Sequence, residues 1–386
     1  MYEAELCVRL GLARSRGVVI KRSLRLETQD ASCYFRTSVT DGSRKALVQI
    51  TERCNLHCAH CFVSSTSQGQ DMSLEDIRDK VIPRLVSAGV ERVTLTGGEP
   101  FVHPEILEIC RSFVERGLPL GLCTNATQTS DDQIRQLVDL GSVHVNVSFD
   151  GFRAETHGLF RGDRSSFELT KLTTQRFADA GILQGLLSTP NVFTTPEEFA
   201  DLCRFALDLG ADYLLMNPLS AMGRGVKSKA RLQASSDLMA EIRSATARFA
   251  AEGIELVHIR FPNSDKPLAG CEAGRIIYVF TDGSTAVCPY LVFAARSPAS
   301  RHADTEFMVG NILEEDLSRP LADYSFHDRY RVGDNPTCGA CSMSDGCGKG
   351  CPAAVVANGE SIGAVDREQC PVVGERELLP ISVGAL

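Results

Sequence analysis

Residues 49–65 read "QITERCNLHCAHCFVSS" and place three thiols, Cys54, Cys58 and Cys61, within eight positions. The segment overlaps the end of "KALVQI" at 45–50, an apolar run that predicts a β-strand. Three thiolates on one loop fit a cubane iron-sulfur cluster whose fourth iron is left open for another ligand. The spacing therefore predicts a metal cluster at the carboxyl end of a strand, with one position that no cysteine fills.

A zinc site is the alternative for the same thiols. Structural zinc takes four ligands, and His57 or His60 inside the motif offers a fourth. Structural zinc sites, however, usually join two pairs of ligands from separate elements, whereas all these residues lie on one loop. The arrangement therefore favours the iron-sulfur interpretation.

Strand and helix patterns alternate from residue 45 to residue 253. Ser73 is expected to cap the first helix, and Gly89 and Gly117 are expected to end the first two. The expected strands are 45–50, 92–97, 120–125, 144–149, 183–188 and 212–217, and the expected helices are 72–89, 103–117, 130–141, 166–181, 195–210 and 235–253. This order predicts an α/β fold with a parallel sheet, as a barrel or an open arc, and an active site at the carboxyl ends of its strands.

Beyond residue 262 the pattern changes to Gly, Pro, Cys and short strands, and Asp282-Gly283 predicts a hairpin turn. This composition predicts a second module that lacks a large core. Segment 219–236, rich in small and basic residues, is expected to be a long loop that covers a site. The expected domains are an unassigned extension at 1–45, the β/α domain at 46–261 and the cysteine-rich module at 262–386.

Composition excludes several classes of function. A formal net charge of −9 without a basic stripe argues against a nucleic-acid surface. No apolar run is long enough to span a membrane, and the acidic start does not resemble a signal peptide, so we expect a cytoplasmic protein without a membrane partner. In that reducing compartment, 15 cysteines indicate metal or redox use rather than disulfides.

The motifs "CNLHCAHC" at 54–61 and "TGGEP" at 96–100 resemble the two signatures of the radical S-adenosylmethionine superfamily. The resemblance implies a partial (β/α)6 TIM-like barrel, in which Cys54, Cys58 and Cys61 hold a 4Fe-4S cluster and S-adenosylmethionine occupies the open iron. It also implies reductive cleavage to a 5′-deoxyadenosyl radical that removes hydrogen from a substrate. A flavodoxin- or ferredoxin-type protein is the electron donor in this interpretation.

The resemblance also suggests contacts to S-adenosylmethionine. Gly97 and Gly98 would let the backbone approach its methionyl group, and the backbone or Glu99 would contact its ammonium. Ser148 in "VSFDG" is the candidate near the ribose or carboxylate, and Arg161 is a second candidate for the carboxylate. A solvated surface arginine is the alternative for Arg161.

The C-terminal cysteines resemble the seven-cysteine motif of the SPASM domain, an auxiliary-cluster extension of the same superfamily. The motif comprises Cys271, Cys288, Cys338, Cys341, Cys347, Cys351 and Cys370. The resemblance implies two auxiliary 4Fe-4S clusters, which gives three clusters in all. The nearer would be held by Cys271, Cys288 and Cys351, and the farther by Cys338, Cys341, Cys347 and Cys370. A zinc ribbon is the alternative for the distal cysteines.

Family members differ in what they modify. We expect a ribosomally synthesised peptide as substrate, modified by a crosslink, thioether or epimerisation in natural-product biosynthesis, and oxidation or epimerisation of a sugar or aminocyclitol is the alternative. Sulfatase maturation is disfavoured, because Pro289 stands where that group has an aspartate. Residues 1–45 are too few for a leader-binding domain, so we expect a separate recognition protein as a partner, direct binding of the peptide, or a small-molecule substrate. An iron-sulfur electron carrier or scaffold is the non-enzymatic alternative, and the methionine-binding motifs count against it.

Two smaller expectations concern single residues. Among the five cysteines outside the clusters, Cys123 lies at a strand end and is the candidate hydrogen donor for an epimerisation, although burial alone is the usual fate of a free cysteine. The five are Cys7, Cys33, Cys110, Cys123 and Cys203. Two cubanes need eight ligands, and the motif supplies seven thiols. We expect the eighth position, on the nearer cluster, to be held by Asp265 or to be open to water or substrate.

Overall fold

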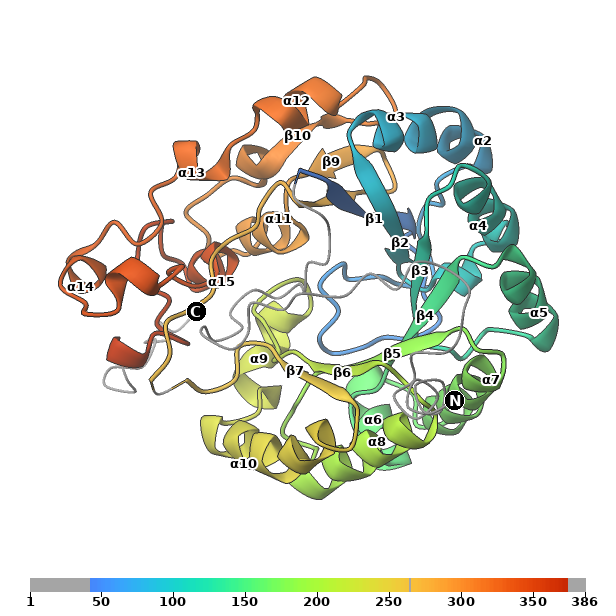
Figure 1. The fold of residues 1–386 in the computed structure, drawn as a ribbon, viewed down its shortest axis with the longest axis horizontal. Coiled ribbons are helices and arrows are strands. Elements are labelled where there is room, and N and C mark those ends of the chain that lie inside the picture. Colours follow the sequence, from blue (N-terminus) through green and yellow to red (C-terminus); the bar gives the residue numbers. More distant parts are fainter. Residues whose placement is uncertain (1–41, 264, 374–386) are drawn as a thin grey trace, which may run out of the picture.

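The computed structural model describes residues 42–263 and 265–373 and forms a curved sheet with helices along its outer side (Figure 1). Within this part the sheet has ten strands in the order β10-β9-β8-β1-β2-β3-β4-β5-β6-β7. The strands are β1 Arg44–Thr51, β2 Val90–Gly97, β3 Leu120–Thr124, β4 Val143–Ser148, β5 Leu183–Ser188, β6 Tyr213–Met216, β7 Glu255–His258, β8 Ile276–Val279, β9 Ser284–Ala286 and β10 Met308–Asn311. Strands β1 to β7 are parallel, which confirms the predicted α/β class and the open arc.

Helices follow the strands as the sequence predicts, with two additions. The first predicted helix is α2 Leu74–Asp76, the π-helical η1 Ile77–Val81 and α3 Ile82–Ser87, and the later predicted ones are α4 Ile106–Glu115, α5 Asp131–Leu140, α7 Ser166–Asp179, α8 Pro196–Asp208 and α10 Ser236–Thr246. The additions are α6 Ala154–Arg161 and α9 Gly225–Leu232. Ser73 caps the first helix by accepting a hydrogen bond from the amide of Asp76, as predicted. Segment 219–236 was predicted as a loop, which is wrong over the span of α9.

Alternation along the strands separates the two faces of the arc. Val48 and Leu122 belong to the main apolar cluster, which the outer helices cover. Their neighbours Gln49 and Cys123 therefore point to the inner face, because successive side chains of a strand alternate. Strand β7 closes the arc at its far edge, and its four residues were not recognised as a strand in the sequence.

The C-terminal region continues the same sheet. Strand β8 pairs in parallel with β1, and β9 and β10 extend it antiparallel, with Gly283 turning the β8-β9 hairpin at φ +85. Its helices are α11 Pro289–Ala295, α12 Ser318–Asp323, α13 Phe326–Arg329, α14 Pro336–Gly339 and α15 Pro352–Ala357, and the short 3-10 turns of the protein are η2 Pro100–Val102, η3 Ala247–Ala250, η4 Asp304–Phe307, η5 Ser344–Gly346 and η6 Pro371–Val373. The predicted hairpin turn is therefore confirmed.

A second apolar cluster fills this region, built around Tyr278, Phe293 and Val356 and joined by Leu47 of β1. The expectation of a module without a sizeable core is therefore wrong. The apolar strand β8 and helices α11 and α15 supply that core, although the cysteine spacing dominates the sequence. The boundary at residue 262 stays a prediction, since one sheet runs across it.

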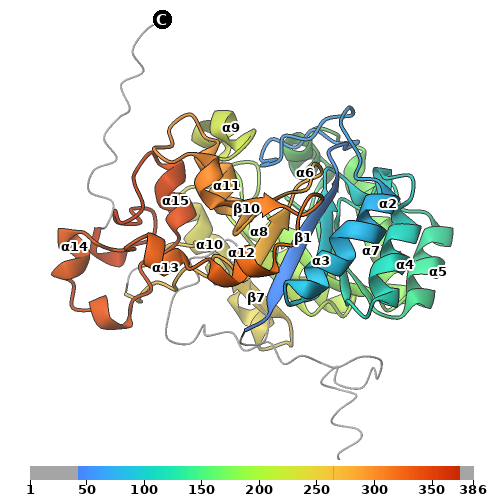
Figure 2. The same cartoon turned by 90° about the horizontal axis from the view of Figure 1, so that it is seen from above.

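The C-terminal region lies on the open side of the arc, between β1 and β7 (Figures 1 and 2). Residues 1–41, which include Cys7, Cys33 and most of the unassigned N-terminal extension, lie outside the described part. Within the described residues, no helix is long and apolar enough to cross a membrane.

Candidate active site

The three thiols of the opening motif lie on the loop that leaves β1, residues 52–65, which we call the cluster loop. The amide of Cys54 donates to the carbonyl of Thr66 at 2.7 Å, which closes the loop on itself. The thiols are close enough to interact electrostatically. The pKa of Cys54 is raised to about 12 and that of Cys58 to about 11, mainly by burial and to a smaller extent by the neighbouring thiols.

This donor set fits an iron-sulfur cluster. Among the described residues, no three His, Cys, Asp or Glu side chains converge on a point that would hold one metal ion. Thiolates of a 4Fe-4S cluster each bind a different iron and need no such convergence. The Sγ of Cys54 already accepts the amide of Leu56 at 3.4 Å, a type of contact that tunes cluster potentials. His57, one alternative ligand, is exposed.

The glycines of "TGGEP" pack against the cluster loop. A Cβ on Gly98 would lie 2.0 Å from the carbonyl oxygen of Arg53 and 3.0 Å from Cβ of Cys54, and one on Gly97 would lie 2.3 Å from the carbonyl oxygen of Thr51. The amides of Gly98 and Glu99 donate to those same two oxygens at 2.9 Å. The end of β2 therefore packs against the start of the cluster loop, and only glycine leaves space for the two carbonyl oxygens.

Glu99 connects the ends of β2 and β3. Its side chain is 1% exposed, and its two carboxylate oxygens accept hydrogen bonds from Thr124 Oγ1 at 2.6 Å, the Asn125 amide at 2.7 Å and the Phe101 amide at 3.1 Å. Burial raises the pKa of Glu99, and these donors oppose that shift. With three protein donors on this carboxylate, its evident role is to position the strand ends.

Arg161 is buried beside the thiols and is not a surface residue. It is 5% exposed, and its Nη2 lies 2.8 Å from Oδ2 of Asp150. Cys58 and Cys54 contribute to its raised pKa, which Asp150 also supports against the effect of burial. The helix that brings it there, α6, was absent from the predicted elements, so this burial was not predicted.

His60 is a further side chain beside Asp150. Its ring stacks on Phe160 with centroids 4.7 Å apart, and its Nε2 lies 3.6 Å from Oδ2 of Asp150. Burial lowers the pKa of His60 to about 4, so the ring is neutral near neutral pH. Ser148, the other predicted contact, ends β4 in a half-buried position two residues before Asp150.

Helix α9 holds the cluster loop from the other side. Arg224 donates through Nε to the carbonyl of Cys58 at 2.8 Å and through Nη1 to that of Ser65 at 2.6 Å. Ser228 Oγ donates to the carbonyl of Ala59 at 2.7 Å. Sequence reasoning expected this segment to cover a site but missed both residues. The signal for Arg224 was a lone arginine between two glycines, eight residues after the end of β6.

The C-terminal thiols form two groups. Cys271, Cys288 and Cys351 are mutual electrostatic neighbours, and burial raises the pKa of Cys288 to about 12 and that of Cys271 well above its usual range. Cys338, Cys341, Cys347 and Cys370 line one small cavity of about 20 Å³. The structure thus brings together the two sets that the resemblance implied, three thiols in one and four in the other.

Asp265 and the spare thiols lie apart from these groups. Asp265 is exposed, which removes it as the fourth ligand of the nearer set in this structure. Cys110 and Cys203 are fully buried in the main core. Cys123 lies half-buried on the inner face of β3, and its pKa is raised to about 11, mainly by burial and to a smaller extent by Glu99.

Comparison with known proteins agrees with this architecture. Residues 48–206 match the model of the Radical SAM superfamily. Mycofactocin maturase MftC of Mycobacterium tuberculosis is 26% identical over 83% of this chain and 81% of its own length. PqqA peptide cyclase of Bradyrhizobium diazoefficiens is 27% identical over 48% of this chain and 49% of its own length. The crystal structure of Streptococcus suis SuiB bound to precursor peptide SuiA matches with a TM-score of 0.65 at 14% identity, over 84% of this chain and 75% of that one, and so has the same fold.

Proposed function

We propose, on the premise that the chain belongs to the radical S-adenosylmethionine superfamily, that it modifies a ribosomally synthesised peptide in natural-product biosynthesis. Membership implies an enzyme that uses S-adenosylmethionine and a 4Fe-4S cluster. The observation that carries the proposal is the cluster loop, whose three neighbouring thiols lie at the carboxyl end of β1 against the glycines that end β2. A cluster bound there supplies the electron that cleaves S-adenosylmethionine and so generates a radical able to take hydrogen from carbon.

In this proposal the residues of the chain bind and orient the reactants. Cys54, Cys58 and Cys61 hold the cluster. Backbone at Gly97 and Gly98 faces the methionyl group, and Arg161, kept charged by Asp150, meets the carboxylate. Ser148 at the end of β4 is the candidate for the ribose. Glu99 positions the strand ends through its hydrogen bonds, and it or the adjacent backbone is the candidate contact to the ammonium.

We further propose that the C-terminal thiols hold two auxiliary clusters, one in each group. The nearer group offers three thiols, so its fourth position is open to water or to the substrate. The four thiols of the farther group suffice for a complete cubane. Backbone amides of Leu268 and Lys349 donate to Sγ of Cys347 at 3.3 Å, which supports a thiolate at that position.

The names of the similar proteins favour a peptide over a sugar as the substrate of this chain. PqqA peptide cyclase acts on a peptide by its name, and SuiB is solved with a precursor peptide. Partners in the proposal are a flavodoxin- or ferredoxin-type donor and a separate protein that recognises the leader peptide. Buried thiols that must stay reduced fit the cytoplasm as the compartment.

The decisive experiment is reconstitution with iron and sulfide, followed by assay with dithionite, S-adenosylmethionine and candidate precursor peptides. We expect 5′-deoxyadenosine together with a peptide whose mass changes by the loss of hydrogen, or stays equal with an inverted centre. Turnover of a sugar or aminocyclitol with no change in any peptide would support the alternative substrate class. Absence of 5′-deoxyadenosine from a fully reconstituted protein would overturn the proposal.

Cys123 provides a narrower prediction, for the case that the outcome is epimerisation. A thiol donor gives one hydrogen atom to the substrate radical, and the resulting thiyl radical needs one electron and one proton from the external donor. Cys123→Ala is expected to keep 5′-deoxyadenosine formation within about twofold while abolishing deuterium transfer from heavy water into the peptide. The matched control is Cys110→Ala, at a thiol buried in the core. Unchanged deuterium transfer in Cys123→Ala would remove Cys123 as the donor.

A further inference from the structure

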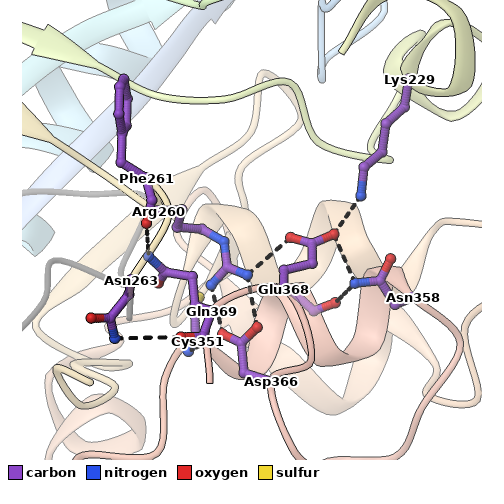
Figure 3. A network of polar contacts seen from close by, with 10 residues as sticks. Lys229, Arg260, Phe261, Asn263, Cys351, Asn358, Asp366, Glu368 and Gln369 are labelled. Carbon is purple, nitrogen blue, oxygen red and sulfur yellow. Dashed lines mark hydrogen bonds and ion pairs between the residues drawn. The ribbon is translucent and has the colours of Figure 1, made fainter. Parts of the chain in front are cut away.

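The C-terminal region is attached to the barrel at both edges of the arc. At the first edge, four residues of β8 pair with Lys45 to Val48 of β1. At the other edge, β7 has β6 as its one strand neighbour within the described sheet. A network of polar contacts centred on Arg260, two residues after β7, joins that edge to residues 351–369 (Figure 3). The two attachments therefore differ in kind: one is a strand pair and the other is ionic.

The network has a buried centre and a more exposed rim. Arg260 and Asp366 are 3% and 2% exposed, and they form a two-pronged ion pair with Nη1-Oδ2 and Nη2-Oδ1 distances of 2.6 and 2.8 Å. Nη2 of Arg260 also lies 2.9 Å from Oε2 of Glu368, whose other oxygen accepts from Lys229 of α9 at 2.5 Å. The same helix α9 that holds the cluster loop thus reaches the C-terminal region as well.

Asp366 contacts both groups of C-terminal thiols through the backbone. The amide of Cys351, in the nearer group, donates to Oδ2 of Asp366 at 3.2 Å. The amide of Cys370, in the farther group, donates to the carbonyl oxygen of Asp366 at 2.9 Å. Next to Cys351, Gly350 has φ +82, and a Cβ there would lie 2.6 Å from Oδ2 of Asp366. The sequence thus keeps space for this carboxylate beside the thiols.

Arg260 also has an unusual backbone. Its φ of +50 lies in the left-handed region, which residues with a side chain rarely adopt. Such conformations persist where the surrounding contacts hold them, and they are concentrated at functional positions. Here the bidentate contact to Asp366 holds Arg260 in place, two residues after the end of β7. Both backbone and side chain are therefore specialised for this contact.

We propose that Arg260 is a positioning residue which, through Asp366, fixes the location of both auxiliary clusters relative to the barrel. The inference rests on the proposed function, because it assumes that the two thiol groups hold clusters. Electron transfer out of a substrate radical in the barrel depends on that location. Loss of the ion pair therefore alters the auxiliary clusters and the fate of the substrate radical, while cleavage of S-adenosylmethionine continues.

The first test isolates the auxiliary clusters by spectroscopy. Arg260→Gln is introduced into a chain in which Cys54, Cys58 and Cys61 are already alanine, so that the reduced protein gives signals from the auxiliary clusters alone. We expect changed electron paramagnetic resonance spectra and midpoint potentials at an iron content close to that of the parent. Asp366→Asn keeps an acceptor for the Cys351 amide but loses the charge, and it should give the same changes. Arg260→Lys should restore part of the parent behaviour.

The second test uses the otherwise unchanged enzyme. In Arg260→Gln, 5′-deoxyadenosine formation should stay within about twofold of the parent, while modified peptide per 5′-deoxyadenosine falls at least about tenfold. The matched control is Arg319→Gln, which removes an exposed ion pair to Asp323 on α12 of the same region. This control should change neither the spectra nor the product ratio.

Three outcomes distinguish the possibilities. A lower melting temperature with unchanged auxiliary spectra and product ratio would reduce the ion pair to a stability role and overturn the inference. If the parent modifies no peptide, the proposed function fails, and the spectra of the auxiliary clusters still decide the role of Arg260. If Arg260→Gln does not fold, Asp366→Asn and Arg260→Lys decide it by the same spectra.

Discussion

Replacing Cys54, Cys58 and Cys61 together by alanine is expected to abolish 5′-deoxyadenosine formation while leaving the auxiliary iron in place. The three thiols lie on the loop after β1, whereas the C-terminal thiols form separate groups in the C-terminal region. With the three cubanes that we propose, the loss of one should lower the iron content by about one third. Iron and sulfide analysis with chromatographic assay of 5′-deoxyadenosine measures both effects.

The control for this variant is a chain with Cys110 and Cys203 replaced by alanine. Both thiols are fully buried in the main core and belong to none of the three groups, so iron content and cleavage should match the parent. Any 5′-deoxyadenosine above background from the triple variant would show that the cluster assignment is wrong. Loss of all iron from it would contradict the separation of the cluster sites.

The second large effect is expected at Arg161. Arg161→Met should weaken binding of S-adenosylmethionine to the reconstituted protein by at least tenfold, about 1.4 kcal/mol. The guanidinium of Arg161 lies 2.8 Å from Asp150 and next to Cys58. Its loss removes the proposed partner of the S-adenosylmethionine carboxylate. It also leaves the Asp150 carboxylate buried without its main counter-charge. Removing one partner of a buried pair costs about 3–5 kcal/mol of stability, so the melting temperature should fall too.

Equilibrium dialysis of labelled S-adenosylmethionine measures the affinity separately from the loss of stability, which the melting temperature reports. Asp150→Asn removes the negative partner of the Arg161–Asp150 pair. It should lower the stability but have a smaller effect on the affinity for S-adenosylmethionine, because the Arg161 guanidinium remains. The matched control is Arg135→Met, at an exposed ion pair on α5, which should change neither quantity. Affinity equal to the parent in a folded Arg161→Met protein would remove Arg161 from the binding site.

Local patterns predicted the parallel arc well. The alternation of apolar runs and helices gave β1 to β6 and the helices that cover them, and Ser73 and Asp282-Gly283 fixed a helix start and a turn. These features depend on residues close in the chain, where capping and turn chemistry act. Strand β7 was missed because four residues beside a glycine-ended helix are too short to show a pattern.

Contacts between distant segments were beyond the sequence. Burial of Arg161 depends on α6 packing against the cluster loop, and the hydrogen bonds of Arg224 depend on α9 folding onto the same loop. A buried arginine and an exposed one have the same local sequence signature. The pairing of β8 with β1 likewise joins positions such as Lys45 and Ile276, whose register no local pattern encodes.

That pairing has a consequence for synthesis on the ribosome. Strand β1 leaves the exit tunnel long before its neighbour β8, and at synthesis rates of about 5–20 residues per second the delay is on the order of tens of seconds. During that time the apolar strand β1 has an unpaired edge, which is a template for association with other chains. Yield in cells should therefore depend on chaperones that hold nascent chains, and slow translation before residue 276 should favour aggregation over assembly.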